Sequence, residues 1–101
     1  MAKLVEKVSK KHKKRVHILA YSFAGVDARC AISLMGLDRY CQSLTTLCSP
    51  HQGMTLVDRA LGVDQYGDLN HCEKALLALG MSKRNVTEFT TRNMTAFNQV
   101  C

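Results

Sequence analysis

Residues 16–25, Val-His-Ile-Leu-Ala-Tyr-Ser-Phe-Ala-Gly, carry the strongest structural signal of this chain. A short apolar run leads directly into Ser22, and a pattern typical of a helix begins immediately afterwards. A serine on a sharp turn between a strand and a helix forms a nucleophile elbow, whose strained backbone lifts the hydroxyl clear of the sheet. Such a turn needs small neighbours, and Ala20, Ala24 and Gly25 supply them. The stretch predicts a strand, a positive φ at Ser22 and a helix that starts near residue 23 or 24.

A second stretch has the same character. Residues 43–53, Ser-Leu-Thr-Thr-Leu-Cys-Ser-Pro-His-Gln-Gly, read as a strand that ends in a Pro-His-x-Gly turn. A mostly apolar segment of helix length, residues 25–37, lies between the two runs. Unalternating apolar runs are typical of fully buried strands. We therefore expect parallel neighbouring strands at 16–20 and 44–48, joined by a right-handed helical crossover.

The remaining segments are predicted to be helical. An apolar stripe formed by Leu4, Val5 and Val8 recurs at helical spacing near the start of the chain and is expected to pack on the sheet. After the Pro-His-x-Gly turn, short apolar stretches alternate with polar and glycine-containing breaks. The expected helices cover residues 2–12, 54–61, 70–79 and 86–100.

Together these stretches resemble the triacylglycerol lipases of the α/β-hydrolase superfamily, especially the bacterial true lipases. In that family an Arg-containing helix, a Thr-Thr strand and a Thr-Pro-His-x-Gly turn follow the serine. This chain has Arg29 in the helix, Thr45-Thr46 in the strand and Ser-Pro-His-Gln-Gly at 49–53. Residues 90–98 are similar to the helix that closes the family's cap region. The sequence departs from the family at Tyr21, where His is usual, and at the two alanines that replace the flanking glycines.

The resemblance implies an α/β fold that is a partial α/β-hydrolase domain over residues 1–101. Its core, residues 1–53, is a parallel βαβ unit with the elbow, and residues 54–101 form a helical region similar to a cap or lid. The implied activity is that of a lipase or carboxylesterase, with Ser22 as the nucleophile and the Phe23 backbone N–H as an oxyanion donor. Neither a cofactor nor a metal is expected.

A serine nucleophile needs a histidine base and an orienting acid. After Ser22 the histidines are His51 and His71. In the resembling lipases the Pro-His-x-Gly histidine is structural, and His71 lies in the cap-like half. The acids Asp58, Asp64 and Asp68 also lie there, whereas the family's acid follows a later strand. We therefore expect the 101-residue chain alone to hydrolyse esters weakly or not at all.

Other interpretations remain open from the sequence. Ser22 would be an ordinary helix N-cap if the chain were only a small βαβ unit. A module that has lost catalysis would bind a lipid or a protein through its apolar cap. The resemblance implies a lipid or ester substrate as one partner. Two parallel strands also leave exposed edges, so either the remainder of a hydrolase or the edge strand of another copy is expected as a second partner.

Composition limits the remaining function classes. No apolar run approaches the roughly 20 residues of a membrane span, and the first residues lack the apolar region of a signal peptide. The chain as it stands would be cytoplasmic, whereas full-length members of the resembling family are often secreted, so the sequence leaves the compartment open. Five irregularly spaced cysteines predict no disulfide framework or zinc site, but buried thiols at Cys30, Cys41 and Cys48. The net charge of +6 is concentrated at residues 10–15. We interpret this run as a solvated helix end rather than a nucleic-acid site, because no aromatic residues interrupt it.

Overall fold

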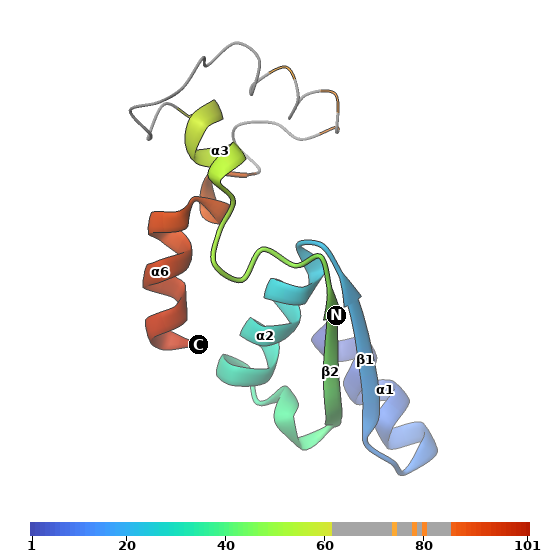
Figure 1. Cartoon of the computed structure of the whole chain (residues 1–101). Coiled ribbons are helices and arrows are strands. Elements are labelled where there is room, and N and C mark those ends of the chain that lie inside the picture. The colour runs from blue at the N-terminus through green and yellow to red at the C-terminus, as the bar shows by residue number, and fades with distance from the viewer. Residues whose placement is uncertain (62–73, 75–77, 79, 81–85) are drawn as a thin grey trace. The chain divides into compact units, whose positions relative to one another are not determined.

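The computed structural model describes residues 1–61, 74, 78, 80 and 86–101 (Figure 1). The chain divides into two compact units, residues 1–51 with 101 and residues 52–100. Three sequence predictions lie largely or wholly outside the described residues: the helix at 70–79, the acids Asp64 and Asp68, and His71.

The first unit contains the predicted parallel βαβ arrangement. Strands β1 and β2 pair in parallel, with Ile18 opposite Leu44 and Ala20 opposite Thr46, which confirms the expected pairing. Helix α2 follows β1 and contacts both strands, and Figure 1 shows it crossing between them. The elements in chain order are α1 (Ala2–His12), β1 (Val16–Tyr21), α2 (Ala24–Leu34), the 3₁₀ helix η1 (Leu37–Arg39) and β2 (Cys41–Leu47).

Two boundaries in this unit differ from the prediction by more than one residue. Strand β2 begins at Cys41, three residues earlier than the apolar run suggested. The Val16 amide donates to the Tyr40 carbonyl and Arg15 donates to the Cys41 carbonyl, so pairing with the start of β1 extends the strand into polar sequence. Helix α2 ends at Leu34 rather than residue 37, because Gly36 adopts a positive φ of 69° before η1.

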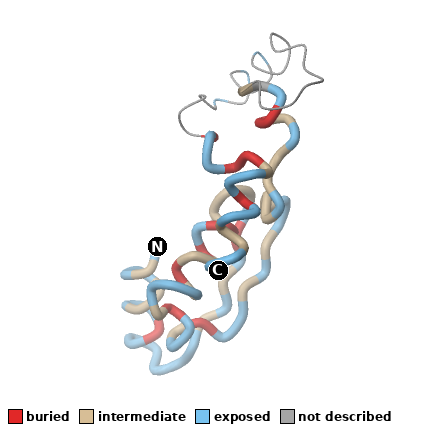
Figure 2. The backbone as a smooth tube through the Cα atoms, turned by 90° about the vertical axis from the view of Figure 1, so that its left-hand side faces the viewer, coloured by how far each residue is buried: buried red, intermediate tan, exposed pale blue. Residues whose placement is uncertain are grey.

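The two faces of the sheet are covered unequally, so the expectation of fully buried strands is wrong. Ala20 and Cys41 are buried, and Ile18 and Leu44 are half-buried on the same face. The opposite face exposes Leu19 and Tyr21, which are 70% and 69% exposed, and also Leu47. Exposed and more buried residues therefore alternate along both strands, as they do in a sheet covered on one side only (Figure 2).

Small residues of α2 form the centre of the first unit's core. Val26, Ala28 and Ala31 of this helix are buried. Small side chains allow a helix to approach a sheet closely, so little apolar volume is needed to close the layer. Leu37 of η1 is buried as well and completes the packing.

The cysteines are all free among the described residues, and their burial varies. Cys41 is buried, and its thiol contacts the Ser43 carbonyl at 3.3 Å. Cys30 is half-buried, whereas Cys48 is exposed. The expectation of a buried thiol at Cys48 is therefore wrong, because the chain leaves the sheet at this residue with a positive φ of 51°.

The second unit contains helix α3 (Thr55–Ala60), the 3₁₀ helix η2 (Thr87–Phe89) and helix α6 (Thr91–Val100). The single helix predicted for residues 86–100 is interrupted at Thr90, whose backbone is extended at φ −62° and ψ 150°. The Thr90 hydroxyl accepts the Asn93 amide at 3.2 Å, so this residue caps the start of α6. Val57, Val86 and Met94 are buried in this unit.

A buried carboxylate connects α3 to the start of α6. Asp58 accepts the Thr91 amide at 2.9 Å through one oxygen and the Thr91 hydroxyl at 2.8 Å through the other. Hydrogen bonds to an ionised acceptor are stronger than neutral ones. Asp58 is thus engaged in holding the second unit together. Over the described parts of the chain, no helix has the length and apolar character that crossing a bilayer requires.

Candidate active site

Ser22 lies at the sharp turn that the sequence predicts. Its φ of 56° is in the left-handed region, which serine rarely adopts, and the expected positive φ is therefore confirmed. The Ser22 amide donates to the Leu47 carbonyl at 2.8 Å, so the residue still belongs to the ladder between the strands. Its carbonyl accepts the Gly25 amide at 3.1 Å, which starts the following helix. Ser22 thus joins the end of β1 directly to α2, and the residue is half-buried.

Phe23 begins the helical backbone after this turn. It has helical dihedral angles of φ −61° and ψ −27° and is the N-cap residue of α2. Its carbonyl accepts the Val26 and Asp27 amides at 3.0 and 3.2 Å. The first amides of a helix have no partner within the helix, and they favour negative charge at its N-terminus. Phe23 thus directly follows Ser22 at the N-terminus of α2.

The closest packing of the elbow occurs at Gly25. A Cβ at this position would lie 2.0 Å from the Ser49 Oγ, 2.7 Å from the Ser49 Cβ and 2.9 Å from the Thr46 Cγ2. Real Cβ atoms do not approach other atoms so closely, so only glycine fits here without a local shift. Ala24 is half-buried, whereas Gly25 is buried. The position that most strictly requires a small residue is therefore Gly25, one residue after Ala24.

The Ser-Pro-His turn lies against the start of α2 through this contact. Cys48, the first residue after β2, has a positive φ of 51°, as Ser22 does after β1. The His51 amide donates to the Ser49 carbonyl at 2.9 Å and tightens the turn. The Ser49 Oγ is buried and makes no hydrogen bond to the described residues. The two strands therefore end in left-handed residues at the same edge of the sheet.

Both ring nitrogens of His51 have partners within the first unit. The Arg29 guanidinium lies 3.2 Å from Nδ1, and the Thr46 hydroxyl lies 3.0 Å from Nε2. A guanidinium only donates, so Nδ1 accepts, and the neutral ring then carries its proton on Nε2 and donates it to Thr46. This chain of contacts connects α2, β2 and the turn. His51 is therefore held as a structural link, and it is not assigned as the base for Ser22.

The other described histidines and acids are spread over the surface or used elsewhere. His17 Nδ1 lies 2.6 Å from the Ser43 hydroxyl on the exposed face of the sheet. Asp27 is exposed on α2, and Asp58 is bound to Thr91. Within the described ranges, no three His, Cys, Asp or Glu residues are grouped so that they would hold a metal ion.

The sequence alone did not predict that Ser49 and Thr46 would lie against Gly25 at the elbow. The sequence indicates that a small residue is needed at Gly25, but the atoms that require it belong to residues far along the chain. Nothing local in the sequence indicates this pairing. Only the alignment of the two strand ends, once their parallel register is known, brings the turn beside the start of α2.

Comparison with solved structures identifies the fold. No family model matches the chain, and no curated protein matches it. The mature form of Bacillus licheniformis lipase BlEst2 superposes with a TM-score of 0.77 at 23% identity, over 98% of this chain and 38% of that chain. The propeptide form gives a TM-score of 0.74 at 24% identity, over 98% of this chain and 21% of that chain. The chain thus spans less than half of the length of these lipase structures, and its fold is similar to that of a part of them.

Proposed function

We propose that the chain is the elbow-bearing part of a lipase or carboxylesterase-type serine hydrolase, with Ser22 as the nucleophile and lipid or other esters as substrates. The observation that carries the proposal is the φ of 56° at Ser22, between a parallel strand and a helix. Strained backbone of this kind persists only where the surrounding structure imposes it, and it is frequent at active sites. The likeness to lipase structures supports the proposal at the level of fold.

The proposed chemistry is acyl transfer in two steps. The Ser22 oxygen attacks the ester carbonyl carbon while a base takes its proton, and the Phe23 N–H stabilises the oxyanion. The alcohol leaves with the proton, and water then cleaves the acyl-enzyme to a carboxylic acid and restores the serine. His51 is engaged by Arg29 and Thr46, so the base must be another residue. In this proposal residues 54–101 are the cap-like region of the hydrolase.

A fluorophosphonate probe tests the role of Ser22 in the chain as it stands. We expect slow labelling, because a nucleophile without its base retains little reactivity. The control residue is Ser33, an exposed serine of α2. Peptide mapping by mass spectrometry is nevertheless expected to find the adduct on Ser22 about tenfold more often than on Ser33, because Ser22 lies beside the amides at the start of α2 and Ser33 does not. Ser22→Ala is expected to remove this adduct, and Ser33→Ala to leave it.

Labelling of the urea-unfolded chain is the control for intrinsic reactivity. The preference for Ser22 is expected to disappear on unfolding, because it depends on the turn. Equal labelling of Ser22 and Ser33 in the folded chain would contradict the proposed nucleophile. Short-chain ester hydrolysis is expected to stay near the background rate in both the parent and the Ser22→Ala chain.

A second candidate function is a non-catalytic module that binds a lipid or a protein. The exposed face of the sheet favours it, because Leu19, Tyr21 and Leu47 are apolar or aromatic side chains left in contact with solvent. Loss of the Ser22 preference in the labelling experiment is the result that would favour this alternative over the hydrolase.

A further inference from the structure

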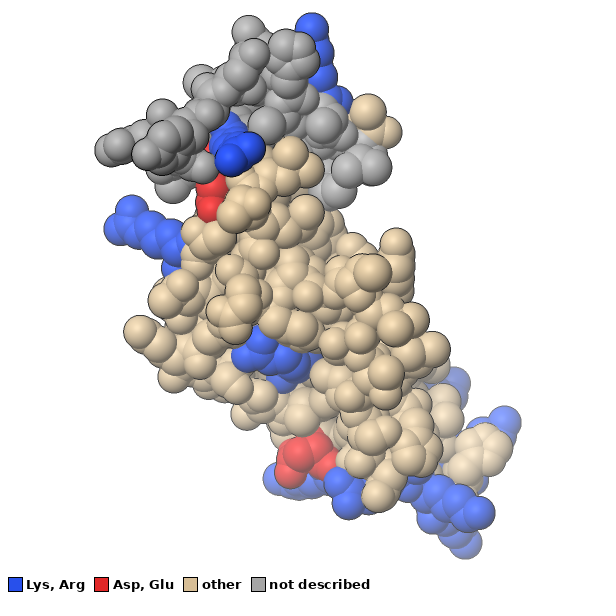
Figure 3. Space-filling model, in the orientation of Figure 1, with Lys and Arg blue, Asp and Glu red and all other residues tan. Residues whose placement is uncertain are grey.

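Helix α1 and the turn after it form the most strongly charged part of the first unit. The first 15 residues contain seven Lys and Arg residues and one acid, Glu6. All seven cationic residues are exposed. Blue side chains gather at the lower right of Figure 3, over the end of the first unit where Figure 1 shows α1 and its C-terminal turn. This surface is strongly positive.

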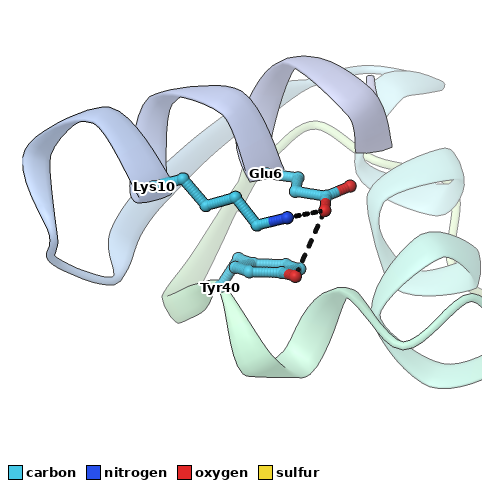
Figure 4. Close-up of polar contacts among 3 residues, drawn as sticks. All are labelled: Glu6, Lys10 and Tyr40. Atoms are coloured by element: carbon cyan, nitrogen blue, oxygen red, sulfur yellow. Dashed lines mark hydrogen bonds and ion pairs between the residues drawn. The ribbon is translucent and has the colours of Figure 1, made fainter.

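The single acid of this segment is neutralised within the fold. The Glu6 carboxylate accepts from Lys10 at 2.5 Å and from the Tyr40 hydroxyl at 3.2 Å (Figure 4). The hydrogen bond from Lys10 is the main cause that lowers the pKa of the Glu6 carboxyl, and Glu6 in turn raises the pKa of Lys10. Lys10 also lies 5.6 Å from the centre of the Tyr40 ring. Glu6 and Lys10 are therefore engaged with each other and with Tyr40.

Arg15 is likewise committed to the fold, since it donates to the Cys41 and Asp38 carbonyls. The remaining lysines of the segment make no ion pair with the described residues. They are Lys3, Lys7, Lys11, Lys13 and Lys14. A cationic surface that the fold does not neutralise is complementary to an anionic partner.

The same helix exposes apolar side chains beside these lysines. Leu4 and Val8, one turn apart, are 65% and 38% exposed. Lys7 and Lys11 share their face of the helix, because residues three and four apart are neighbours. The inner side is formed by other residues, among them the buried Ser9, whose hydroxyl donates to the Lys14 carbonyl at 2.6 Å. Leu4 is therefore mostly turned to solvent, and Val8 keeps about a third of its surface exposed, so the expectation that this stripe packs on the sheet is wrong for Leu4.

We propose that α1 docks the chain on an anionic lipid surface, with Leu4 and Val8 entering the headgroup region and Lys7 and Lys11 contacting the lipid phosphates. A helix that combines exposed apolar residues with flanking lysines is suited to a membrane interface, where long lysine side chains reach back to the charged layer. Leu4 and Val8 would make no favourable contact with the charged phosphate backbone of a nucleic acid, so the apolar pair favours a lipid surface as the partner. The docking does not depend on the chemistry proposed for Ser22.

Sedimentation with large unilamellar vesicles tests this docking on the full 101-residue chain. We expect binding to vesicles of phosphatidylcholine with about 30% phosphatidylserine, and at least about tenfold weaker binding to phosphatidylcholine alone. Lys7→Gln with Lys11→Gln is expected to weaken binding to the anionic vesicles about 30-fold, since each lysine near such a surface contributes about 1 kcal/mol. Leu4→Ser is expected to weaken it about fivefold or more through lost apolar burial.

Matched variants separate the α1 surface from net charge and general hydrophobicity. Arg59→Gln with Arg92→Gln removes the same charge from exposed positions of the second unit and is expected to leave binding within about twofold, because neither residue belongs to the α1 surface. Leu34→Ser alters an exposed leucine of α2 and is also expected to be neutral. Circular dichroism of each variant verifies that the helices persist.

Two results would overturn the proposal. If the double arginine variant weakened binding as much as the double lysine variant, net charge alone would be responsible for binding. Binding unaffected by Leu4→Ser, together with equal binding to a DNA duplex, would assign the surface to polyanions in general. The vesicle assay involves no turnover, so failure of the proposed hydrolase activity leaves its outcome unchanged.

Discussion

Gly53→Ala is expected to destabilise the second unit by about 3 kcal/mol, a loss of more than about 100-fold in its folding equilibrium. Gly53 has a φ of 84°, and a Cβ there would lie 2.6 Å from the Thr91 Cα, 2.7 Å from the Thr91 nitrogen and 2.8 Å from the Thr90 oxygen. These are backbone atoms at the start of α6, so they cannot rotate away as a side chain would. Strain at positive φ and displacement of α6 therefore both add to the cost.

Hydrogen exchange followed by mass spectrometry measures this loss locally. Amides of α3 and α6 are expected to exchange faster in Gly53→Ala, while those of β1 and β2 keep their protection, because the contact lies within the second unit. Gly36→Ala is the matched control. Its φ is 69°, but no atom of the described chain lies within 4 Å of the place its Cβ would occupy, so it carries only the positive-φ cost of about 1 kcal/mol. Equal effects of the two substitutions would show that the contact with Thr91 is unimportant.

Gly25→Ala is expected to destabilise the first unit by about 2 kcal/mol, or about 30-fold. An alanine inside a helix normally gains about 1 kcal/mol over glycine, so this expectation opposes intrinsic propensity. Overlap of the new Cβ with Ser49 and Thr46 outweighs that gain, at about 3 kcal/mol. Exchange of the β1 and β2 amides, compared with the parent chain, measures the difference.

Ser49→Ala completes a double-mutant cycle. The Ser49 Oγ is the nearest atom to the new Cβ and lacks a hydrogen bond to the described residues, so its removal alone is expected to be neutral or slightly stabilising. Combined with Gly25→Ala it is expected to recover about half of the loss, because the Ser49 Cβ and Thr46 Cγ2 remain too close. Additive effects of the two substitutions would rule out the contact as the cause.

Much of the first unit follows from the sequence because its signals are local. Apolar runs before Ser22 and before Cys48, with a helix-length spacer, are sufficient to predict a parallel pair and its crossover. The positive φ at Ser22 follows from the requirements of a strand-to-helix elbow. These features depend on near neighbours in the chain, and the structure contains them where the sequence indicates.

The departures have both local and non-local causes. Whether Leu19 and Tyr21 are buried depends on what covers the second face of the sheet, which an apolar run does not specify. The interruption at Thr90 comes from capping by its hydroxyl, which competes with continuation of the helix. In the candidate site, the contacts of His51 depend on the register of the two strands. The catalytic roles of Ser22 and Phe23 remain proposals.

The left-handed backbone at position 22 suits glycine better than the serine that occupies it. A serine at a φ of 56° lowers the stability of the folded chain by about 1 kcal/mol relative to glycine, which adopts that backbone freely. Selection for stability alone would therefore favour glycine here. The hydroxyl is the one group that serine adds at this turn, so under the proposed function some stability is given up at a single residue in exchange for a nucleophile.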